Sequence, residues 1–382
     1  MLSDSLRMRF YLSLFVASLG LGMYTYFIPV FAQSLGATYF DLGLIGAVGA
    51  LATAITPSLA GHMADKTNRF WVFSLSLMVS VLATFILVFS RSVIDIVILR
   101  LVGGVGLGIF WPMGEAMASD LAPANKRVRE MGRYSVAMAM GILVGPSVGG
   151  VIVQILGYFN LFLISSAVIG LSLLQSILWV LPAYSKENQD APRSQNSAGN
   201  MHIVRDIFPM YMMLMCYGVV WGLLTSIFPG YANSIGITAT LIGFLFSAFG
   251  ITRIVSLATA HRYLKFGEKR IIAAVSSMIF VGILILAGIP GFTTFLVGMM
   301  LIGGGVGVVF PVAINLISRQ FPDEKRATAM GSYETAVNTG ETMGPYVAGV
   351  LASLTSITSS LMLMSVFALL MIVFTASGHT RS

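Results

Sequence analysis

Six ionisable side chains lie inside, or at the edge of, long apolar runs in this 382-residue chain. They are Arg100, Glu115, Arg133, Arg253, Glu334 and Glu341. A charge at the centre of a membrane-spanning helix costs about 2.5 to 3.5 kcal/mol on insertion scales, so such residues usually pair or line a water-filled cavity. The carboxyl groups could therefore carry protons, and the guanidinium groups could pair with them or with an anion.

Glu341 is our first choice as a proton carrier. It stands three residues before Gly344-Pro345. We expect it about 20 Å from the cytoplasmic face, near the middle of the bilayer, since a helix rises about 1.5 Å per residue. Arg100 is expected at a similar depth. The alternative role for Glu341 is a permanent ion pair with Arg100 or Arg253.

A polar stripe surrounds Glu341 in the sequence. Glu334, Asn338 and Glu341 are spaced i, i+4 and i+7, which places them on one face of a helix. Such a stripe is either the wall of a cavity or a seam between helices. Glu334 and Glu115 are the secondary proton-carrying candidates, and equal depth favours pairing of Glu115 with Arg133 and of Arg253 with Glu334.

Aromatic residues and 23 methionines could line a broad apolar pocket, although helix packing uses the same residue types. The aromatic candidates for a substrate cavity are Tyr24, Tyr26, Trp111, Tyr134, Tyr217, Trp221 and Tyr333. The first apolar run has no acid between Met8 and Gln33, which argues against a substrate recognised as a cation.

The composition excludes a soluble globular protein, because 57% of residues are hydrophobic and only 10% are charged. Twelve apolar runs of about 18 to 25 residues are long enough to cross a bilayer. They lie near 10–31, 41–61, 70–90, 94–119, 130–153, 160–182, 207–230, 239–260, 271–289, 293–317, 329–352 and 357–376. We therefore predict an all-α membrane protein with twelve transmembrane helices in two pseudo-symmetric six-helix bundles.

The chain is an internal duplication. Pro112 matches Pro311 in an ungapped register of 199 positions, and Pro29 matches Pro229 in a register of 200. The register of 199 also aligns Gly104, Lys126, Arg127, Tyr134, Gly141, Gly145, Pro146 and Gly150 with Gly303, Lys325, Arg326, Tyr333, Gly340, Gly344, Pro345 and Gly349. We predict bundles at residues 1–182 and 207–382, joined by a polar linker at 183–206. A site between two such halves can face either side of a membrane in turn.

Basic residues gather in every second loop, which places both termini and the linker in the cytoplasm by the positive-inside rule. We therefore expect the basic residues that give the net charge of +7 to interact with acidic lipid headgroups and not with nucleic acid. One cysteine and four histidines give no metal framework, and no phosphate-binding G-x-x-x-x-G-K-[ST] motif is present. We expect no cofactor, with a proton gradient as the energy source, and no enzymatic activity.

Three short motifs lie on the predicted helices and in the loop after the second of them. The loop after the second run supplies Gly61, Asp65, Lys66 and Arg69. Asn68 stands where a glycine is usual, which is a mild departure because asparagine tolerates the left-handed backbone that a glycine would take there. The fourth run supplies Arg100, Gly104, Gly106, Pro112 and Asp120. The fifth run supplies Gly141, Gly145, Pro146, Gly149 and Gly150, a helix kink beside bare backbone that would admit a helix from the other half.

These three motifs resemble those of the major facilitator superfamily. The resemblance implies a conformational latch of Gly61, Asp65, Arg69 and Asp120, and it points to the proton-coupled drug and metabolite efflux antiporters. We expect a monomer in the cell (plasma or inner) membrane that exports small lipophilic molecules in exchange for protons. One alternative is proton-coupled transport of a defined polar metabolite or organic anion, with Arg100 and Arg253 as its counter-ions. Another is a lipid-handling or sensing member of the same fold.

Overall fold

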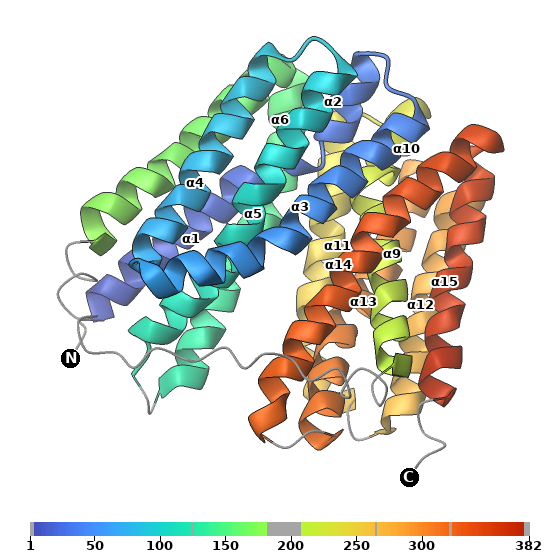
Figure 1. The fold of residues 1–382 in the computed structure, drawn as a ribbon. Coiled ribbons are helices and arrows are strands. Elements are labelled where there is room, and N and C mark those ends of the chain that lie inside the picture. Colours follow the sequence, from blue (N-terminus) through green and yellow to red (C-terminus); the bar gives the residue numbers. More distant parts are fainter. Residues whose placement is uncertain (1–3, 124–125, 182–207, 264–265, 321–322, 378–382) are drawn as a thin grey trace. The chain divides into compact units, whose positions relative to one another are not determined.

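The computed structural model describes residues 4–123, 126–181, 208–263, 266–320 and 323–377, and the elements in these ranges are helices (Figure 1). The predicted linker at 183–206 lies outside the described residues. The first half contains α1 (Asp4–Thr25), α2 (Ile28–Ser34), α3 (Tyr39–Lys66), α4 (Arg69–Ile86), η1 (Leu87–Phe89), α5 (Val93–Leu121), α6 (Arg127–Gln175) and η3 (Ser176–Val180). The second half contains α9 (Phe208–Ser226), α10 (Phe228–Ser234), α11 (Ala239–Tyr263), α12 (Glu268–Gly288), α13 (Phe292–Gln320), α14 (Asp323–Leu354) and α15 (Ile357–Ser377).

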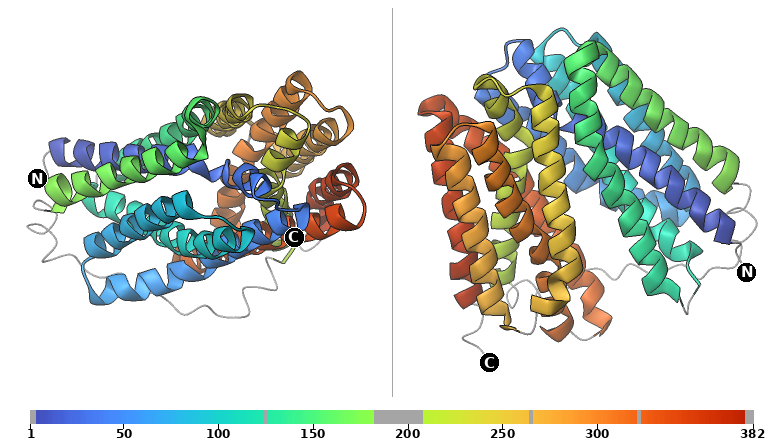
Figure 2. Two further views of the ribbon diagram at one scale, coloured as in Figure 1. Left: turned by 90° about the horizontal axis from the view of Figure 1, so that it is seen from above. Right: turned by 180° about the vertical axis from the view of Figure 1, so that it is seen from behind.

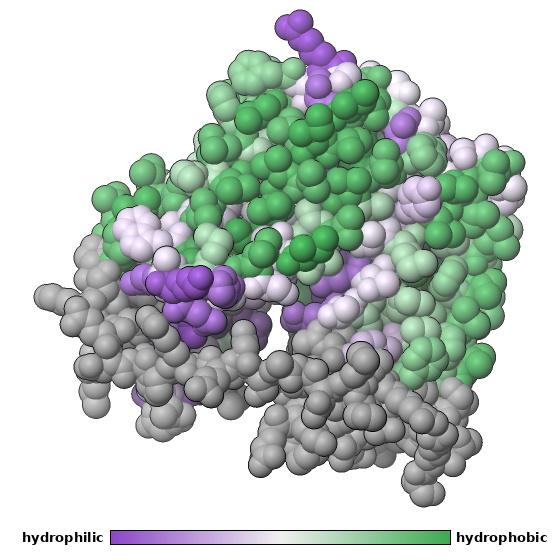
Figure 3. All heavy atoms as spheres, viewed as in Figure 1, coloured by the Kyte–Doolittle hydropathy of each residue, from purple (hydrophilic) through white to green (hydrophobic). Residues whose placement is uncertain are grey.

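The predicted all-helical, multi-span membrane fold is confirmed. Ten helical stretches of the described residues are long and apolar enough to cross a membrane. Large apolar side chains such as Ile94, Ile155 and Leu354 are 70 to 74% exposed, as expected for contact with lipid and not water. Hydrophobic side chains cover most of the coloured surface seen in Figure 3, and hydrophilic ones gather toward helix ends.

Two features explain why ten stretches stand where twelve runs were predicted. The predicted fifth and sixth runs are two helices that meet at Gly157, whose φ of 79° and ψ of 174° are not helical. Because no loop separates the two helices, residues 129–180 count as one stretch. The eleventh run lies in α14, which is less apolar than α13 and α15 because polar and charged side chains occur along it. Both differences are local, since the predicted runs coincide with observed helices.

The duplication is visible in the backbone of the first helix of each half. α1 is followed by the short helix α2, with Pro29 in its first turn, and α9 is followed by α10, with Pro229 in the same position. Two residues after the end of each short helix stands a glycine with positive φ, 91° at Gly36 and 88° at Gly236. These two glycines are 200 positions apart, as the sequence register requires.

Gly36→Ala and Gly236→Ala are expected to lower stability by similar amounts, about 1 kcal/mol each, because a Cβ strains a left-handed backbone. Thermal unfolding of the purified variants in detergent would measure the two losses. Gly36→Asn should cost less, since asparagine tolerates this region better. Unequal losses at the two positions would contradict equivalent conformations.

Packing divides the chain into two compact units that differ slightly from the sequence halves. The first packing unit comprises residues 1–36, 51–194 and 238–244, and the second comprises residues 37–50, 195–237 and 245–382. In the first unit, α1 lies along α6 and α4 along α5 (Figures 1 and 2). In the second, α9 lies along α14, and α12 packs with α13 and α15. Corresponding helices therefore pair in the same way in both units.

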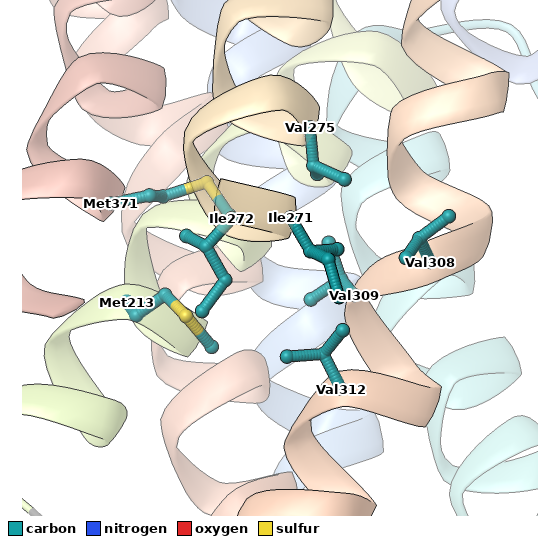
Figure 4. Close-up of a pocket in the computed structure, with 8 residues that line it drawn as sticks. All are labelled: Met213, Ile271, Ile272, Val275, Val308, Val309, Val312 and Met371. Atoms are coloured by element: carbon teal, nitrogen blue, oxygen red, sulfur yellow. The ribbon is translucent and has the colours of Figure 1, made fainter. Parts of the chain in front are cut away.

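A small apolar cavity lies inside the second packing unit. Met213, Ile271, Ile272, Val275, Val308, Val309, Val312 and Met371 line it (Figure 4). The register of 199 places Phe73 and Phe110 at the positions of Ile272 and Val309, and those two rings stack at 5.7 Å in the first unit. The cavity therefore arises where smaller side chains replace a stacked aromatic pair, and its lining offers no polar group to a substrate.

Candidate functional site

Glycines of α6 form a close seam with α1 inside the first packing unit. A Cβ on Gly141 would lie 2.6 Å from Cβ of Ser18, and one on Gly145 would lie 2.7 Å from the backbone of Gly22. A Cβ on Gly149 would collide with the carbonyl oxygen of Met23. These positions therefore need glycine because two helix backbones are in contact.

The second packing unit repeats this seam between α14 and α9. A Cβ on Gly340 would collide with the carbonyl oxygen of Met215, and one on Gly344 would lie 2.5 Å from that of Val219. The equivalent glycine in the first unit, Gly141, meets the carbonyl of Phe15, the residue 200 positions before Met215. The contacts thus confirm the register that the sequence gives for these helices.

The expectation that this motif receives a helix from the other half was only partly right. Gly141, Gly145 and Gly149 pack against α1 of their own half. Two members of the motif do meet the start of α11. A Cβ on Gly150 would lie 2.5 Å from the carbonyl oxygen of Ala239, and a Cβ on Gly243 would collide with the carbonyl oxygen of Pro146. α6 also continues through Pro146, and its non-helical residue is Gly157.

Gly340→Ala is expected to destabilise the protein by about 1 to 3 kcal/mol, because the added methyl group must push α14 away from α9. Gly132→Ala is the matched control, since nothing lies within 4 Å of a Cβ at that helical glycine. The control should be neutral or slightly stabilising. Thermal unfolding of both variants checks the prediction, and equal effects would contradict the seam.

Two members of the predicted latch are in contact. Nη1 of Arg69 donates to both carboxylate oxygens of Asp120 at 2.8 and 2.9 Å. Asp65 is exposed at the end of α3, and Gly61 lies one turn earlier on the same helix. The structure therefore brings the start of α4 to the end of α5, with Asp65 outside the ion pair.

The expected left-handed backbone at Asn68 is wrong. Its φ and ψ are −76° and 128°, and its side chain accepts a hydrogen bond from the backbone N–H of Phe70 at 2.9 Å. Asparagine stands here because it caps α4, since its side-chain oxygen satisfies an N–H that the first helical turn leaves unpaired.

A buried charge cluster at the beginning of α6 was not predicted from the sequence. Glu130 is 1% exposed, and its carboxylate accepts hydrogen bonds from Tyr11 at 3.0 Å and Arg133 at 2.9 Å. Nε of Arg7 lies 3.6 Å from the same carboxylate. Arg133 therefore pairs with Glu130 and not with Glu115, which is exposed on α5.

The missed cluster had a signal in the sequence. Glu130 is an acid within a basic turn and stands three positions before Arg133, the spacing of a helical ion pair. Glu130 was not among the predicted site residues. The structure buries it because α1 covers that end of α6.

In the first packing unit, Tyr24 and Arg100 are brought together at a small pocket. Its lining is otherwise apolar and consists of Ile28, Ala83, Leu87, Ile96, Leu99 and Gly103. The other aromatic candidates are dispersed. Tyr26 is buried, Tyr134 is buried with its hydroxyl 3.5 Å from the carbonyl of Trp111, and Trp111 itself is partly exposed.

In the second packing unit, the predicted aromatic and charged residues form one group on α9, α11 and α14. The guanidinium carbon of Arg253 lies 5.2 Å from the centre of the Trp221 ring, a cation–π contact. Tyr217 is buried one turn before Trp221, within electrostatic range of both Arg253 and Glu341. The predicted pairing of Arg253 with Glu334 is not among the ion pairs of the described residues.

The polar stripe of α14 runs from the exposed Glu334 to the half-buried Asn338 and Glu341. Glu341 adjoins the glycine seam, because its backbone oxygen would lie 2.7 Å from a Cβ on Gly222 of α9. Tyr333 also lies on α14, but its side chain is outside the described residues. The group in the second unit therefore consists of Tyr217, Trp221, Arg253, Asn338 and Glu341, which we call the second-half site.

The duplication provides an internal control for the second-half site. At the equivalent positions the first half has Ala17, Leu21, Thr53, Ala139 and Ile142. Contacts support this equivalence, because a Cβ on Gly108 would press on the carbonyl oxygen of Thr53 and one on Gly307 on that of Arg253. Two copies of one scaffold thus differ by two rings, two charges and an amide, which packing of the shared scaffold does not require.

The sequence profile described as Major Facilitator Superfamily matches residues 10–209 and again residues 210–379. The chain belongs to this superfamily. It is 25% identical over 358 residues to the "Multi-drug resistance efflux pump PmrA homolog" of Lactococcus lactis, covering 91% of this chain and 88% of that protein. It is 28% identical over 389 residues to the "Staphyloferrin B transporter" of Staphylococcus aureus, covering 93% and 88%. The solved structure of the nucleoside transporter NupG aligns with a TM-score of 0.82 at 14% identity, covering 99% of this chain and all of that one.

Superfamily membership makes the protein a multi-pass membrane transporter with a small-molecule substrate, and not an enzyme. The resemblance drawn from the three motifs is thereby confirmed. The names of these relatives give different substrates, so the relatives do not identify the substrate of this chain.

Proposed function

We propose that this superfamily transporter exports a small lipophilic molecule in exchange for protons, by alternating access, with Glu341 as the proton carrier. The observation that carries the proposal is the second-half site, in which Glu341 packs against α9 at Gly222, beside the Trp221 ring that Arg253 contacts. The first half has isoleucine at the position of Glu341, so the carboxyl group is no part of the common scaffold.

Exchange requires that proton and substrate exclude each other. An ionised Glu341 can hold a hydrogen-bond donor or a positive group of the substrate, whereas a protonated Glu341 cannot hold it as strongly. Protons entering from outside then release the substrate there, and loss of the proton inside restores the site. The membrane potential adds about 2.3 kcal/mol per charge for each 100 mV.

Other features support the proposal without deciding it. A relative that covers most of the chain is named an efflux pump. The ion pair between Arg69 and Asp120 suits a latch that holds one conformation, with Asp65 as an added partner in the other. Tyr24, Trp111 and Tyr134 remain candidates for a substrate surface in the first half.

Transport into sealed vesicles tests the proposal. The purified protein is reconstituted, and a lipophilic fluorescent substrate is offered with and without an imposed pH gradient. We expect uphill accumulation only with the gradient, and its loss when a protonophore is added. A sensing protein would bind the substrate without accumulating it, and gradient-independent equilibration would contradict proton exchange.

A further inference from the structure

We propose that the second-half site recognises an amphoteric substrate, an aromatic or apolar body that carries one acidic and one basic group. Arg253 would bind the acidic group, and Glu341 would bind the basic group. The rings of Tyr217 and Trp221 would hold the body between them. This inference rests on the proposed exporter and narrows its substrate class.

Arg253 has the properties of an anion receptor. It lies on α11, within a candidate membrane span, and is only partly exposed. Among the described residues its guanidinium has the face of Trp221 as its partner and no carboxylate within ion-pair distance. The ring satisfies none of the five guanidinium N–H donors, and a guanidinium can bind a carboxylate by two parallel bonds.

Close backbone packing holds α11 at Arg253. Gly303 and Gly307 of α13 let the backbone of α11 approach closely, and the carbonyl oxygens of Phe249 and Arg253 fill those two places. Phe249 also contacts the Trp221 ring at 5.5 Å between centroids. The guanidinium therefore contacts the ring of Trp221 from α9, and that ring in turn packs against Phe249 of α11.

Glu341 gives the same site an opposite charge. The backbone of Glu341 lies against α9 next to both aromatic residues, because a Cβ on Gly218 would lie 3.0 Å from the backbone nitrogen of Glu341 and a Cβ on Gly222 would lie 2.7 Å from its carbonyl oxygen. A substrate with one charge would meet one favourable and one unfavourable partner here. A substrate with both charges meets two favourable ones, with the rings of Tyr217 and Trp221 available to its apolar body.

An amphoteric substrate is also consistent with exchange. A purely anionic substrate beside Glu341 would favour protonation of that carboxyl group, so anion and proton would bind together and move in the same direction. A basic group on the substrate needs Glu341 ionised, so a proton displaces it. The acidic group then adds affinity through Arg253 without opposing the exchange.

Binding of three matched probes tests the inference. The zwitterion is para-(aminomethyl)phenylbutyrate. The acid that lacks the ammonium group is para-methylphenylbutyrate, and the amine that lacks the carboxylate is para-propylbenzylamine. Their affinities for the full-length protein in lipid nanodiscs at neutral pH are measured by calorimetry, with no gradient present. We expect the zwitterion to bind at least about tenfold more tightly than either analogue.

The variants assign each charge to its partner. Arg253→Gln should weaken binding of the zwitterion about tenfold, to the level of the amine, and leave the amine within about twofold. Glu341→Gln should bring the zwitterion to the level of the acid and leave the acid unchanged. Arg262→Gln, an exposed arginine nearer the end of α11, is the matched control and should change none of the three affinities.

Three outcomes would overturn the inference: no binding of the zwitterion, no preference for it over the better analogue, or equal weakening of all three probes by Arg253→Gln. The third would show that Arg253 only supports the fold. Because binding is measured without a gradient, the preference can hold while gradient-driven transport fails, which would overturn the proposed function alone. If gradient-driven transport holds but the zwitterion is not preferred, only the substrate class is overturned.

Discussion

Glu341→Gln is expected to abolish uphill transport while leaving the protein folded and able to exchange substrate across the membrane. Glutamine keeps the shape of glutamate and its hydrogen-bonding groups but takes up no proton, so the gradient no longer acts on the cycle. A pH difference of one unit stores about 1.4 kcal/mol per proton, enough for about tenfold accumulation of substrate by the wild type. The accumulation ratio of the variant should fall to about one.

The measurement is paired with substrate counterflow, in which labelled substrate exchanges against unlabelled substrate without a gradient. Retained counterflow with lost accumulation would assign the defect to coupling and not to folding. Glu334→Gln serves as the comparison on the same stripe of α14, because Glu334 is exposed whereas Glu341 is half-buried. Uphill transport by the Glu341 variant at the wild-type rate, or its loss in the Glu334 variant alone, would show that the wrong acid was chosen.

Glu130→Gln is expected to cost about 3 to 5 kcal/mol of stability, the largest loss we expect from a single substitution outside the glycine seams. The carboxylate is buried with Arg7, whose side chain is 5% exposed, and removal of its charge leaves a buried guanidinium without this counter-ion. Arg133 is less affected, because its side chain is 41% exposed and can turn toward water. Thermal and denaturant unfolding in detergent would measure the loss.

A double variant separates charge burial from packing. Arg7→Met combined with Glu130→Leu replaces the buried pair by apolar side chains of similar size, which is often neutral or stabilising. It should therefore recover most of the stability that Glu130→Gln loses. Glu115→Gln, at an exposed acid on α5, should stay within about 0.5 kcal/mol of the wild type. A loss below about 1 kcal/mol for Glu130→Gln would contradict the buried pairing.

The fold could be predicted from sequence because each apolar run must satisfy its own backbone hydrogen bonds in lipid, which leaves the helix as the natural choice. The repeated glycines and prolines then identified equivalent helices, and Gly36 and Gly236 have the same unusual backbone. The break between the fifth and sixth runs was predicted between residues 153 and 160, and in the structure it lies at a single residue, Gly157.

The candidate site was predicted residue by residue, but its pairings were not. Depth along a helix placed Arg133 near Glu115, whereas the partner is Glu130 on the same helix, one turn earlier. Depth gives no information about which way a side chain points around the helix axis, and that angle decides its partner. A cation–π contact such as that of Arg253 with Trp221 also depends on the angle and was out of reach for the same reason.

Comparison of the two halves at equal register separates the candidate site residues from those that belong to the shared scaffold. Trp221, Arg253 and Glu341 replace Leu21, Thr53 and Ile142, so the sequence alone marks them as additions to a shared scaffold. The role of Asn68 could not be predicted in this way, because asparagine suits both a left-handed turn and a helix cap and only its backbone angles distinguish the two.

The composition of the packing units bears on how this protein could be assembled from pieces. Residues 37–50 pack with the second unit, where a Cβ on Gly349 would lie 2.7 Å from the carbonyl of Tyr39, and residues 238–244 pack with the first. A gene split at the linker would thus give two polypeptides, each holding a segment that packs with residues encoded on the other. Neither fragment should mature alone, and complementation should require that both be synthesised together in the same membrane.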